Sequence, residues 1–401
     1  MTNTTLEVMF WACVAAIVYN YAGYPLALFI LSTFSQAKSD LQFLIGKRTR
    51  RQPRAATGLP RVAILLSVYN EEAVIQAKVE NFLTLDYPQD RLELLIGLDC
   101  PTDSTAALLS QYQCERVKIV ASSKRQGKLA VLRSLLKLTS AEVVITTDAN
   151  TMLDATCVRN LVRHFSDPRV GAVSGEERRI VTPGTDPSAE SLYWRYESAL
   201  KFLENRMNCS LGGNGSVLAV RRKLFRLRKP SIVEDFQIPL DIRFAGYRVV
   251  YDPEAIAVED ICPTPTAQFA RRVRLGAGAY QALFDNLACL DPRKGMPAFC
   301  FFSHRVLRWV APIFMIGAFL SSLCLVASPM FFLLSALQCC FYSSAFIGYL
   351  RKRRGERAGI FALPVHFCAM NLALLVGLIQ YLSGRQSLAW KATPRAAQRT
   401  A

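Results

Sequence analysis

Charged side chains are absent from three long stretches of the chain. Residues 8–37, 309–350 and 358–384 contain no Asp, Glu, Lys or Arg. A helix of about 20 apolar residues suffices to cross a lipid bilayer. The pattern therefore predicts one span near the amino terminus, two spans that turn near Ser328-Pro329, and one further span in the last stretch. A cleaved signal peptide would begin with basic residues, so the first stretch is interpreted as a retained anchor.

The middle of the chain shows a different pattern, in which short apolar runs alternate with amphipathic segments. Five runs are typical of buried strands, at residues 61–68, 92–98, 117–120, 143–145 and 170–173. Helical patterns lie between or after them, at residues 71–85, 127–138, 154–165 and 234–245. Such alternation predicts an α/β domain with a mostly parallel sheet covered on both faces. Ligands bind such sheets at the carboxyl ends of the strands.

Residues 266–284 form a separate amphipathic segment. Apolar side chains recur at helical spacing on one stripe, at Phe269, Val273, Ala277, Tyr280 and Phe284. Arg271, Arg272 and Arg274 flank the stripe. Such a helix either lies in the lipid headgroup plane, which the neighbouring spans favour, or packs on a protein core.

Basic clusters orient the spans. Lys and Arg follow the first span at positions 47, 48, 50, 51 and 54, and the third span at positions 351–354 and 357. Positive charge marks the cytoplasmic side of a membrane. The sequence thus predicts a multi-pass protein of the inner (plasma) membrane with its α/β domain in the cytoplasm. The basic tail at 385–401 would lie outside against this rule, unless the last segment is re-entrant or the tail forms an interfacial helix.

The remaining composition narrows the class of protein. The formal net charge of +17 suits anionic phosphates or acidic headgroups, and no nucleic-acid-binding motif is present. The 12 cysteines include no C-x-x-C pair, which favours free thiols in a reducing compartment over a disulfide framework or a zinc site. The three histidines are too scattered to suggest zinc.

Polar side chains follow the strand predicted at 143–145. Asp148 and Asn150 are two residues apart, so on extended backbone they point the same way. Their oxygens could hold one hard divalent cation. The alternative is a helix cap in a strand-to-helix turn.

Two other strand ends carry polar groups that we expect at the same edge. Ser67, Tyr69 and Glu71 follow the first strand, and Asp99 follows the second. Further along the chain are two short groups suited to a phosphate and to proton transfer: Arg125 with Lys128, and Glu234 with Asp235. Gly127-Lys128 lacks the earlier glycine and following Ser or Thr of a Walker loop. The adjacent acids either complement a helix dipole or supply a general base.

Together these residues resemble the membrane-bound family 2 glycosyltransferases of the GT-A, Rossmann-like fold, over roughly residues 60–310. The resemblance implies a nucleotide-sugar donor, with UDP the favoured nucleotide, and Mg²⁺ or Mn²⁺. It assigns Ser67, Tyr69 and Glu71 to the nucleotide pocket, Asp99 to the base, and Arg125 and Lys128 to the donor. It assigns Asp148 to diphosphate and metal, with Asn150 in the metal motif, and Val173-Ser174-Gly175 and Gly213-Asn214-Gly215 to the acceptor side. It makes Asp235 the catalytic base beside Glu234.

Two departures from the family pattern matter. The metal motif ends in Asn150 instead of Asp, which removes one negative charge. The processive Q-x-x-R-W motif is aligned with Arg271-Arg272-Val273-Arg274-Leu275, which keeps Arg274 among the donor-binding residues but lacks the glutamine and the tryptophan. Loss of that stacking surface argues against processive chain extension. The stretch resembles the R-R-x-V-R-type variant of exopolysaccharide glycosyltransferases.

The sequence thus predicts an inverting glycosyltransferase that builds an exopolysaccharide or glycan at the inner membrane face. One alternative is transfer of a single sugar to a lipid acceptor; a glycoside hydrolase and an inactive nucleotide-sugar-binding scaffold are others. The oligomeric state stays open. The expected organisation is an anchor (1–37), a basic linker (38–59), a GT-A domain (60–262), interface helices (263–307), three spans (308–384) and a basic tail (385–401).

Overall fold

The computed structural model describes residues 3–46, 58–180, 188–226, 231–260 and 265–385. The basic cluster predicted at 47–54 and all but the first residue of the predicted basic tail therefore lie outside the described residues. The chain forms two compact units. We call them the sheet unit (35–180 and 204–267) and the helical unit (1–34, 181–203 and 268–386).

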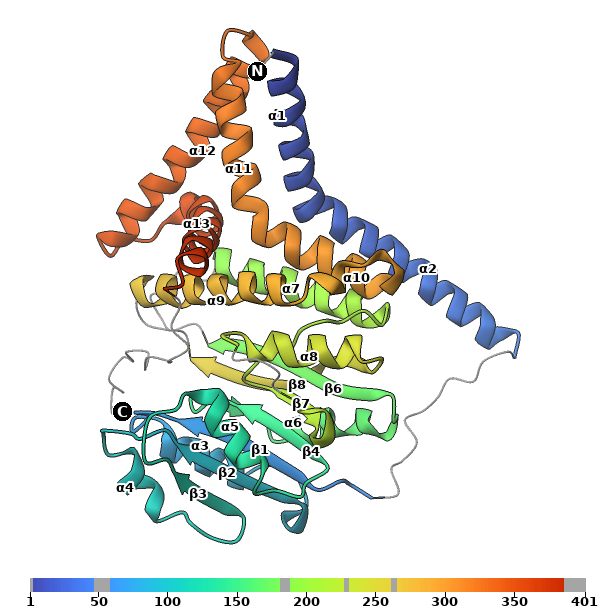
Figure 1. Ribbon diagram of the computed structural model, residues 1–401, viewed down its shortest axis with the longest axis vertical. Helices are drawn as coiled ribbons and strands as arrows, with labels where there is room; N and C mark the ends of the chain where they lie inside the picture. Colours follow the sequence, from blue (N-terminus) through green and yellow to red (C-terminus); the bar gives the residue numbers. More distant parts are fainter. Residues whose placement is uncertain (1–2, 47–57, 181–187, 227–230, 261–264, 386–401) are drawn as a thin grey trace. The chain divides into compact units, whose positions relative to one another are not determined.

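One eight-stranded sheet forms the centre of the sheet unit (Figure 1). Its strands are β1 (Val62–Val68), β2 (Leu92–Leu98), β3 (Val117–Ala121), β4 (Val143–Thr147), β5 (Thr151–Leu153), β6 (Val170–Ile180), β7 (Leu218–Arg221) and β8 (Arg248–Asp260). Their order is β3-β2-β1-β4-β7-β6-β8-β5. The pairs β1–β2, β1–β4, β2–β3 and β6–β8 are parallel, whereas β4–β7, β6–β7 and β5–β8 are antiparallel. The predicted mostly parallel α/β sheet is confirmed.

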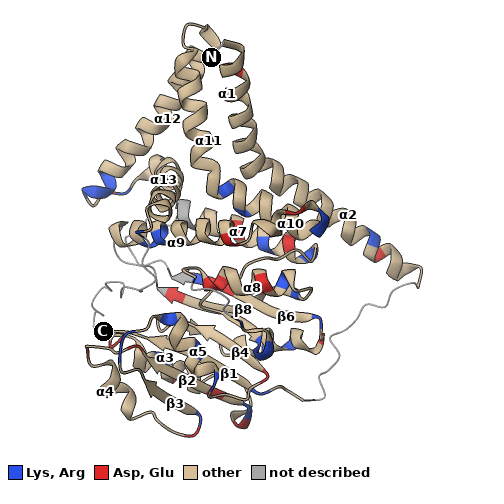
Figure 2. Ribbon diagram, in the orientation of Figure 1, with Lys and Arg blue, Asp and Glu red and all other residues tan. Residues whose placement is uncertain are grey.

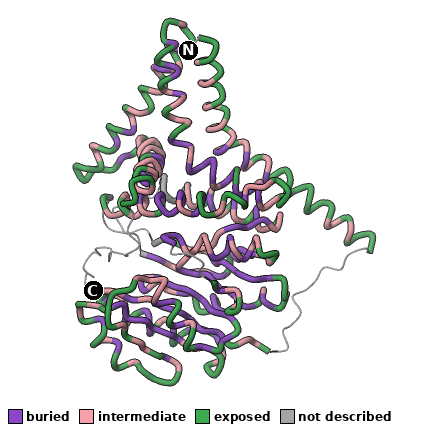
Figure 3. Tube along the Cα trace, viewed as in Figure 1, coloured by how far each residue is buried: buried purple, intermediate pink, exposed green. Residues whose placement is uncertain are grey.

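Helices cover both faces of this sheet. Alternate residues of β1 point to opposite faces, so Ile64 joins the core on one face and Leu65 the core on the other. The first core is completed by α3 (Ile75–Leu83), α4 (Thr105–Ser110) and α6 (Cys157–Val162), and the second by α5 (Lys128–Leu136) and α8 (Glu234–Phe244). Figure 3 shows the strands as the most continuously buried part of this unit.

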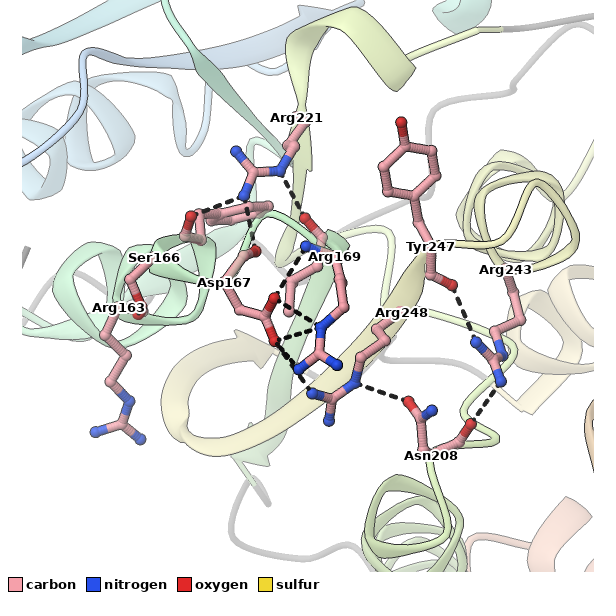
Figure 4. A network of polar contacts seen from close by, with 11 residues as sticks. Arg163, Ser166, Asp167, Arg169, Asn208, Arg221, Arg243, Tyr247 and Arg248 are labelled. Carbon is pink, nitrogen blue, oxygen red and sulfur yellow. Dashed lines mark hydrogen bonds and ion pairs between the residues drawn. The ribbon is translucent and has the colours of Figure 1, made fainter. Parts of the chain in front are cut away.

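A network of arginines lies at the sheet edge opposite the carboxyl ends of β1 and β4 (Figure 4). Arg221 pairs in register with Val143, the first residue of β4, and its guanidinium donates to the carbonyls of Phe165, Asp167 and Val170. Other members bind side chains: Arg169 donates to the Asp167 carboxylate, and Arg248 to Asn208 and Asp167. These hydrogen bonds hold the turn at residues 165–170 against β7 and β8.

The helical unit contains most of the long apolar helices. Its elements are α1 (Asn3–Val18), α10 (Met296–Cys300), α11 (Leu307–Cys324), α12 (Pro329–Arg353) and α13 (Ala362–Leu382), with the larger parts of α7 (Ser188–Arg206) and α9 (Pro265–Asp285) and the first part of α2 (Tyr24–Leu44). Within the described residues, four helical stretches are long and apolar enough to cross a membrane: Asn3–Leu44, Met296–Cys324, Pro329–Arg353 and Gly359–Leu382. The turn predicted at Ser328-Pro329 separates α11 from α12.

Short segments complete the secondary structure. Turns of 3₁₀ helix lie at Gln89–Arg91, Arg163–Ser166, Arg222–Leu224, Leu287–Leu290, Pro292–Lys294 and Gly359–Phe361. Single π-helical turns interrupt the first span at Tyr19–Gly23 and precede α11 at Phe301–Val306. The Tyr19 hydroxyl and the Ser303 hydroxyl, one from each π turn, are 2.9 Å apart.

The predicted amphipathic helix exists as α9, and most of its apolar stripe is covered. Val273, Ala277 and Tyr280 are buried, and the Tyr280 hydroxyl donates to the Trp309 carbonyl. Phe284 at the end of the stripe is half exposed and stacks on Tyr381. This arrangement favours the second alternative, packing within the protein, over insertion of the stripe among headgroups.

Candidate active site

Two loops at the carboxyl ends of β1 and β2 are hydrogen-bonded into one framework. The Asn70 carboxamide, on a residue with φ of 53°, accepts from the Thr102 N–H at 2.8 Å. The buried Glu71 donates its N–H to the Thr105 hydroxyl at 2.9 Å. Ser67, near the end of β1, and Tyr69, in the loop that follows, were expected in the nucleotide pocket and are partly exposed. The first two polar strand ends therefore meet, as the parallel sheet requires.

Asp99 ties a third loop to this framework. Its carboxylate is 4% exposed and accepts from the N–H groups of Gln126 at 2.6 Å and Gly127 at 2.9 Å. Gly127 has a φ of 86°, which favours glycine. The Arg125 guanidinium lies 3.7 Å over the Tyr69 ring. Asp99 thus shapes the Arg125–Lys128 segment.

Lys128 is the electrostatic centre of the site. It begins α5, and its ammonium donates to Asp148 Oδ1 at 2.9 Å and pairs with Glu234 Oε1 at 2.8 Å. Burial lowers the pKa of Lys128, but the Asp148 and Glu234 carboxylates outweigh burial and raise it overall. Lys128 therefore stays charged and joins the strand end at β4 to the helix start at α8.

Asp235 lies in the first turn of α8, next to this charge cluster. Burial raises the pKa of the Asp235 carboxyl to about 6; the neighbouring Glu234 and Asp148 also raise it, while Lys128 opposes them. Gly213 donates its N–H to the Asp235 carbonyl at 3.0 Å. A Cβ on Gly215 would lie 3.3 Å from Asp235 Oδ2, so glycine leaves room for this carboxyl group.

The turn between β4 and β5 presents the predicted metal-binding oxygens. Asp148 and Asn150 lie in a turn closed by the Thr151 N–H and the Asp148 carbonyl at 3.2 Å. Asn150 donates its amide N–H to Glu259 Oε1 of β8 at 3.0 Å, which leaves the carbonyl oxygen as the atom of this side chain that can ligate a cation. The turn leads into a strand, so the helix-cap alternative is wrong.

The donor set fits a cation that is shared with a substrate. In the part of the chain that the structure describes, no three His, Cys, Asp or Glu side chains come close enough to hold a metal by themselves. Mg²⁺ is commonly bound by one or two protein oxygens together with substrate phosphates. Asp148 and Asn150 meet that pattern.

The two acceptor-side segments also meet. Asn214 donates its backbone N–H to the Ser174 hydroxyl at 2.9 Å and its amide N–H to the Gly175 carbonyl at 2.8 Å. A Cβ on Gly175 would lie 2.2 Å from the Ala255 carbonyl oxygen, so only glycine allows this backbone approach.

Arg274, expected among the donor-binding residues, lies on α9 in the helical unit. The same helix offers a second alignment of the processive motif. Gln268 and Arg271 have the spacing Q-x-x-R, with Arg272 in the tryptophan position. This alignment restores the glutamine, but the aromatic side chain is missing in both.

Two residues of the site were not predicted. Glu259 orients Asn150 from β8, a strand whose pairing with β6 is broken by register shifts. Lys78 of α3 is 2% exposed, and its ammonium donates to the Thr147 hydroxyl at 2.9 Å. Burial lowers the pKa of Lys78 to about 7, although the Asp148 charge raises it. The one signal available in the sequence was the position of Lys78 between apolar residues of a predicted helix.

Comparison with known proteins agrees with this geometry. Residues 63–226 match the model of glycosyl transferase family 2. The chain carries a family 2 glycosyltransferase domain. A β-monoglucosyldiacylglycerol synthase of Synechocystis is 26% identical over 268 residues, which is 63% of this chain and 55% of the relative. A poly-β-1,6-N-acetyl-D-glucosamine synthase of Staphylococcus aureus is 23% identical over 267 residues, 63% of each chain.

The chain shares its fold with a solved structure over most of its length. A mannosyltransferase from Pyrobaculum calidifontis, in complex with GDP-mannose and Mn²⁺, covers 95% of this chain and 99% of its own, with a TM-score of 0.72 and 21% identity. This likeness establishes the fold and confirms the GT-A prediction. The curated relatives are matched over only 55% to 63% of their length, so their activities are not transferred by similarity alone.

Proposed function

We propose that the protein is an inverting glycosyltransferase that transfers a sugar from a nucleotide sugar, with UDP-sugars favoured, to a glycan or lipid acceptor at the inner face of the plasma membrane. The observation that carries the proposal is the single cluster formed by Asp148, Lys128, Glu234 and Asp235. It joins a diphosphate-binding turn to a base whose pKa lies near 6. The cytoplasmic placement rests on the basic residues at the end of α12 (Figure 2).

Each residue of the cluster has a distinct task. Asp235 takes the proton from the acceptor hydroxyl, so that its oxygen forms a bond to the anomeric carbon while the bond to the donor diphosphate breaks. A raised pKa makes this carboxylate a stronger base than an ordinary aspartate. Glu234 holds Lys128, which places a positive charge beside Asp148 and the donor phosphates.

Asp148 and Asn150 would hold Mg²⁺ or Mn²⁺ together with the diphosphate. When bound, the cation offsets the negative charge that develops on the departing nucleotide. This role requires no third protein ligand.

The acceptor distinguishes the main proposal from its nearest rival. The absence of tryptophan from the Q-x-x-R stretch of α9 favours transfer of a single sugar to a lipid over processive polymerisation. One of the two relatives is named as a glycolipid synthase and the other as a polysaccharide synthase, so similarity does not choose between them.

A donor panel tests the proposal. Membranes that contain the protein are incubated with labelled UDP- and GDP-sugars, and the products are separated by organic extraction and by size. We expect label from one donor in a lipid-soluble or polymeric product. A lipid-soluble product of fixed small size supports single transfer, and a ladder supports polymerisation. No incorporation from any donor would support the inactive scaffold, and cleavage of a glycan without nucleotide would support the hydrolase.

A further inference from the structure

Lys78 places an ionisable amino group in the apolar core of the sheet unit. It projects from α3, between the buried Ile75 and Val79, on the sheet face opposite α5. Burial of an ammonium group costs free energy unless its hydrogen bonds are satisfied. Leu or Met would fill this position without that cost, so the polar contacts of Lys78 need a reason.

Two hydrogen bonds of the Lys78 amino group flank the diphosphate-binding turn. The amino group donates to the Thr147 hydroxyl, on the last residue of β4, and to the Thr151 carbonyl, on the first residue of β5. The three residues between these partners are Asp148, Ala149 and Asn150. One amino group therefore joins the two ends of the turn that presents the predicted metal-binding oxygens.

The turn is held from two sides. Lys128, on the α5 face of the sheet, contacts the Asp148 carboxylate itself. Lys78, on the α3 face, donates hydrogen bonds to the flanking threonines. The first interaction acts at the site where a donor would bind, and the second fixes the backbone that carries the ligands.

We propose that Lys78 is a positioning residue for the divalent cation and diphosphate: it holds Asp148 and Asn150 at the separation that lets both oxygens bind one cation. The inference rests on the proposed function and extends it to a residue that touches neither donor nor acceptor. Groups that orient metal ligands in this way typically contribute about 10- to 100-fold to metal affinity.

The chain offers a matched control one helical turn away. Asn81, also on α3, donates to the Leu153 carbonyl and accepts from the Leu153 N–H, both at 2.8 Å. Asn81 therefore anchors β5 to the same helix, but beyond the turn. If Lys78 only stabilised the packing of α3 against β5, Lys78→Met and Asn81→Leu would have the same kind of effect.

The test measures cation binding directly. Mn²⁺ affinity is determined by electron paramagnetic resonance on purified full-length protein with UDP present, together with the melting temperature. We expect Lys78→Met to weaken Mn²⁺ binding about 10-fold or more. Asn81→Leu lowers the melting temperature but leaves the Mn²⁺ affinity at the wild-type value.

A second variant keeps the inference falsifiable if Lys78→Met does not fold. Thr147→Val keeps the β-branched shape and removes one acceptor of Lys78, so we expect a smaller loss of Mn²⁺ affinity in a folded protein. Wild-type Mn²⁺ affinity in folded Lys78→Met and in folded Thr147→Val would overturn this inference and leave the proposed function standing. A wild-type protein that binds no Mn²⁺ would overturn the metal site of the proposed function, and this inference with it.

Discussion

The Asp235 carboxyl group combines a proposed chemical role with an unfavourable environment for its charge. Burial and the neighbouring Glu234 raise its pKa to about 6, against the attraction of Lys128. Burying this carboxylate costs free energy. In return its pKa lies closer to the working pH, which suits a general base. The sequence predicted the residue, but burial could not be read from it.

The pH dependence of transfer follows from that pKa. The reactive form is the carboxylate, so kcat/KM should rise about tenfold per pH unit below 6 and level off above 7. Initial rates of sugar transfer between pH 4.5 and 8.5, at saturating divalent cation, measure the profile. A rate that stays constant down to pH 4.5 would show that the base has an ordinary aspartate pKa.

Asn150 is the site's departure from the family pattern, and Glu259 explains it. The Asn150 N–H donates to the Glu259 carboxylate. An aspartate at position 150 would instead set two carboxylates against each other, at a cost of about 1–3 kcal/mol.

We therefore expect Asn150→Asp to lower the melting temperature without cation and to bind Mn²⁺ more tightly than wild type, because a carboxylate is the stronger ligand for a hard cation. Saturating Mn²⁺ should restore much of the lost stability. Thermal unfolding with and without Mn²⁺ measures both effects, and Asn160→Asp, the same change outside the site, is the control. An unchanged melting temperature without cation would contradict this account of Asn150.

At the level of elements, the apolar runs predicted the strands that lie in the buried middle of the sheet. β1, β2, β4 and the start of β6 are found where the runs are, because strands covered on both faces are apolar throughout. β5 and β7 are only three and four residues long, too short for a periodic signal. β8 pairs with β6 across register shifts, which break the alternation by which strands are recognised.

Prediction of the helices and of the site also failed where the structure depends on contacts between distant parts of the chain. The helix predicted from residue 71 begins at Ile75, because Glu71 is held in the loop by Thr105. Asp148, Lys128 and Asp235 were predicted because their order along the chain, together with the other motifs, resembles the family pattern. Lys78 and Glu259 were missed because their roles depend on contacts 69 or more residues apart in the sequence.

Small residues set the packing of α9 against α13. A Cβ on Gly377 would lie 2.7 Å from the Ala277 nitrogen and 2.9 Å from the Val273 carbonyl oxygen. Close backbone approach through glycine is a recurrent means of helix association in membranes.

Gly377→Ala should therefore separate the two helices and lower the melting temperature in detergent by several degrees, corresponding to about 1–3 kcal/mol of overpacking. Leu372→Phe, which enlarges a half-exposed side chain of α13, serves as the control and should have little effect. Equal melting temperatures for Gly377→Ala and wild type would show that α9 and α13 do not pack closely at Gly377.

For the whole molecule, the excess of positive charge has several uses. Part of it closes turns in the arginine network of Figure 4, part lies in the last turn of α12, and part lies inside the helical unit. In the helical unit, Arg308 pairs with Glu197 of α7, and both side chains are buried. His304 Nε2 is 3.4 Å from the same carboxylate.

Loss of Glu197 should destabilise the helical unit strongly. Glu197→Gln leaves Arg308 buried without its counter-charge, which costs about 3–5 kcal/mol. Thermal unfolding in detergent measures the loss, and the double variant Glu197→Leu/Arg308→Met should recover part of it. The control is Glu356→Gln, which breaks an exposed pair with Arg351 and should cost about 0–1 kcal/mol. Similar losses for the two glutamine variants would contradict a buried ion pair.

The most direct test of the account compares sugar transfer by wild type and Asp235→Asn, with and without a divalent cation, using the donor that the panel identifies. Asp86→Asn, the same change in an exposed ion pair with Arg159, is the control. We expect Asp235→Asn to lose about 10²–10⁴-fold in kcat while it still binds nucleotide, and chelation of the cation to abolish transfer by wild type. Full activity of Asp235→Asn, or transfer that is unaffected by chelation, would contradict the proposed active site.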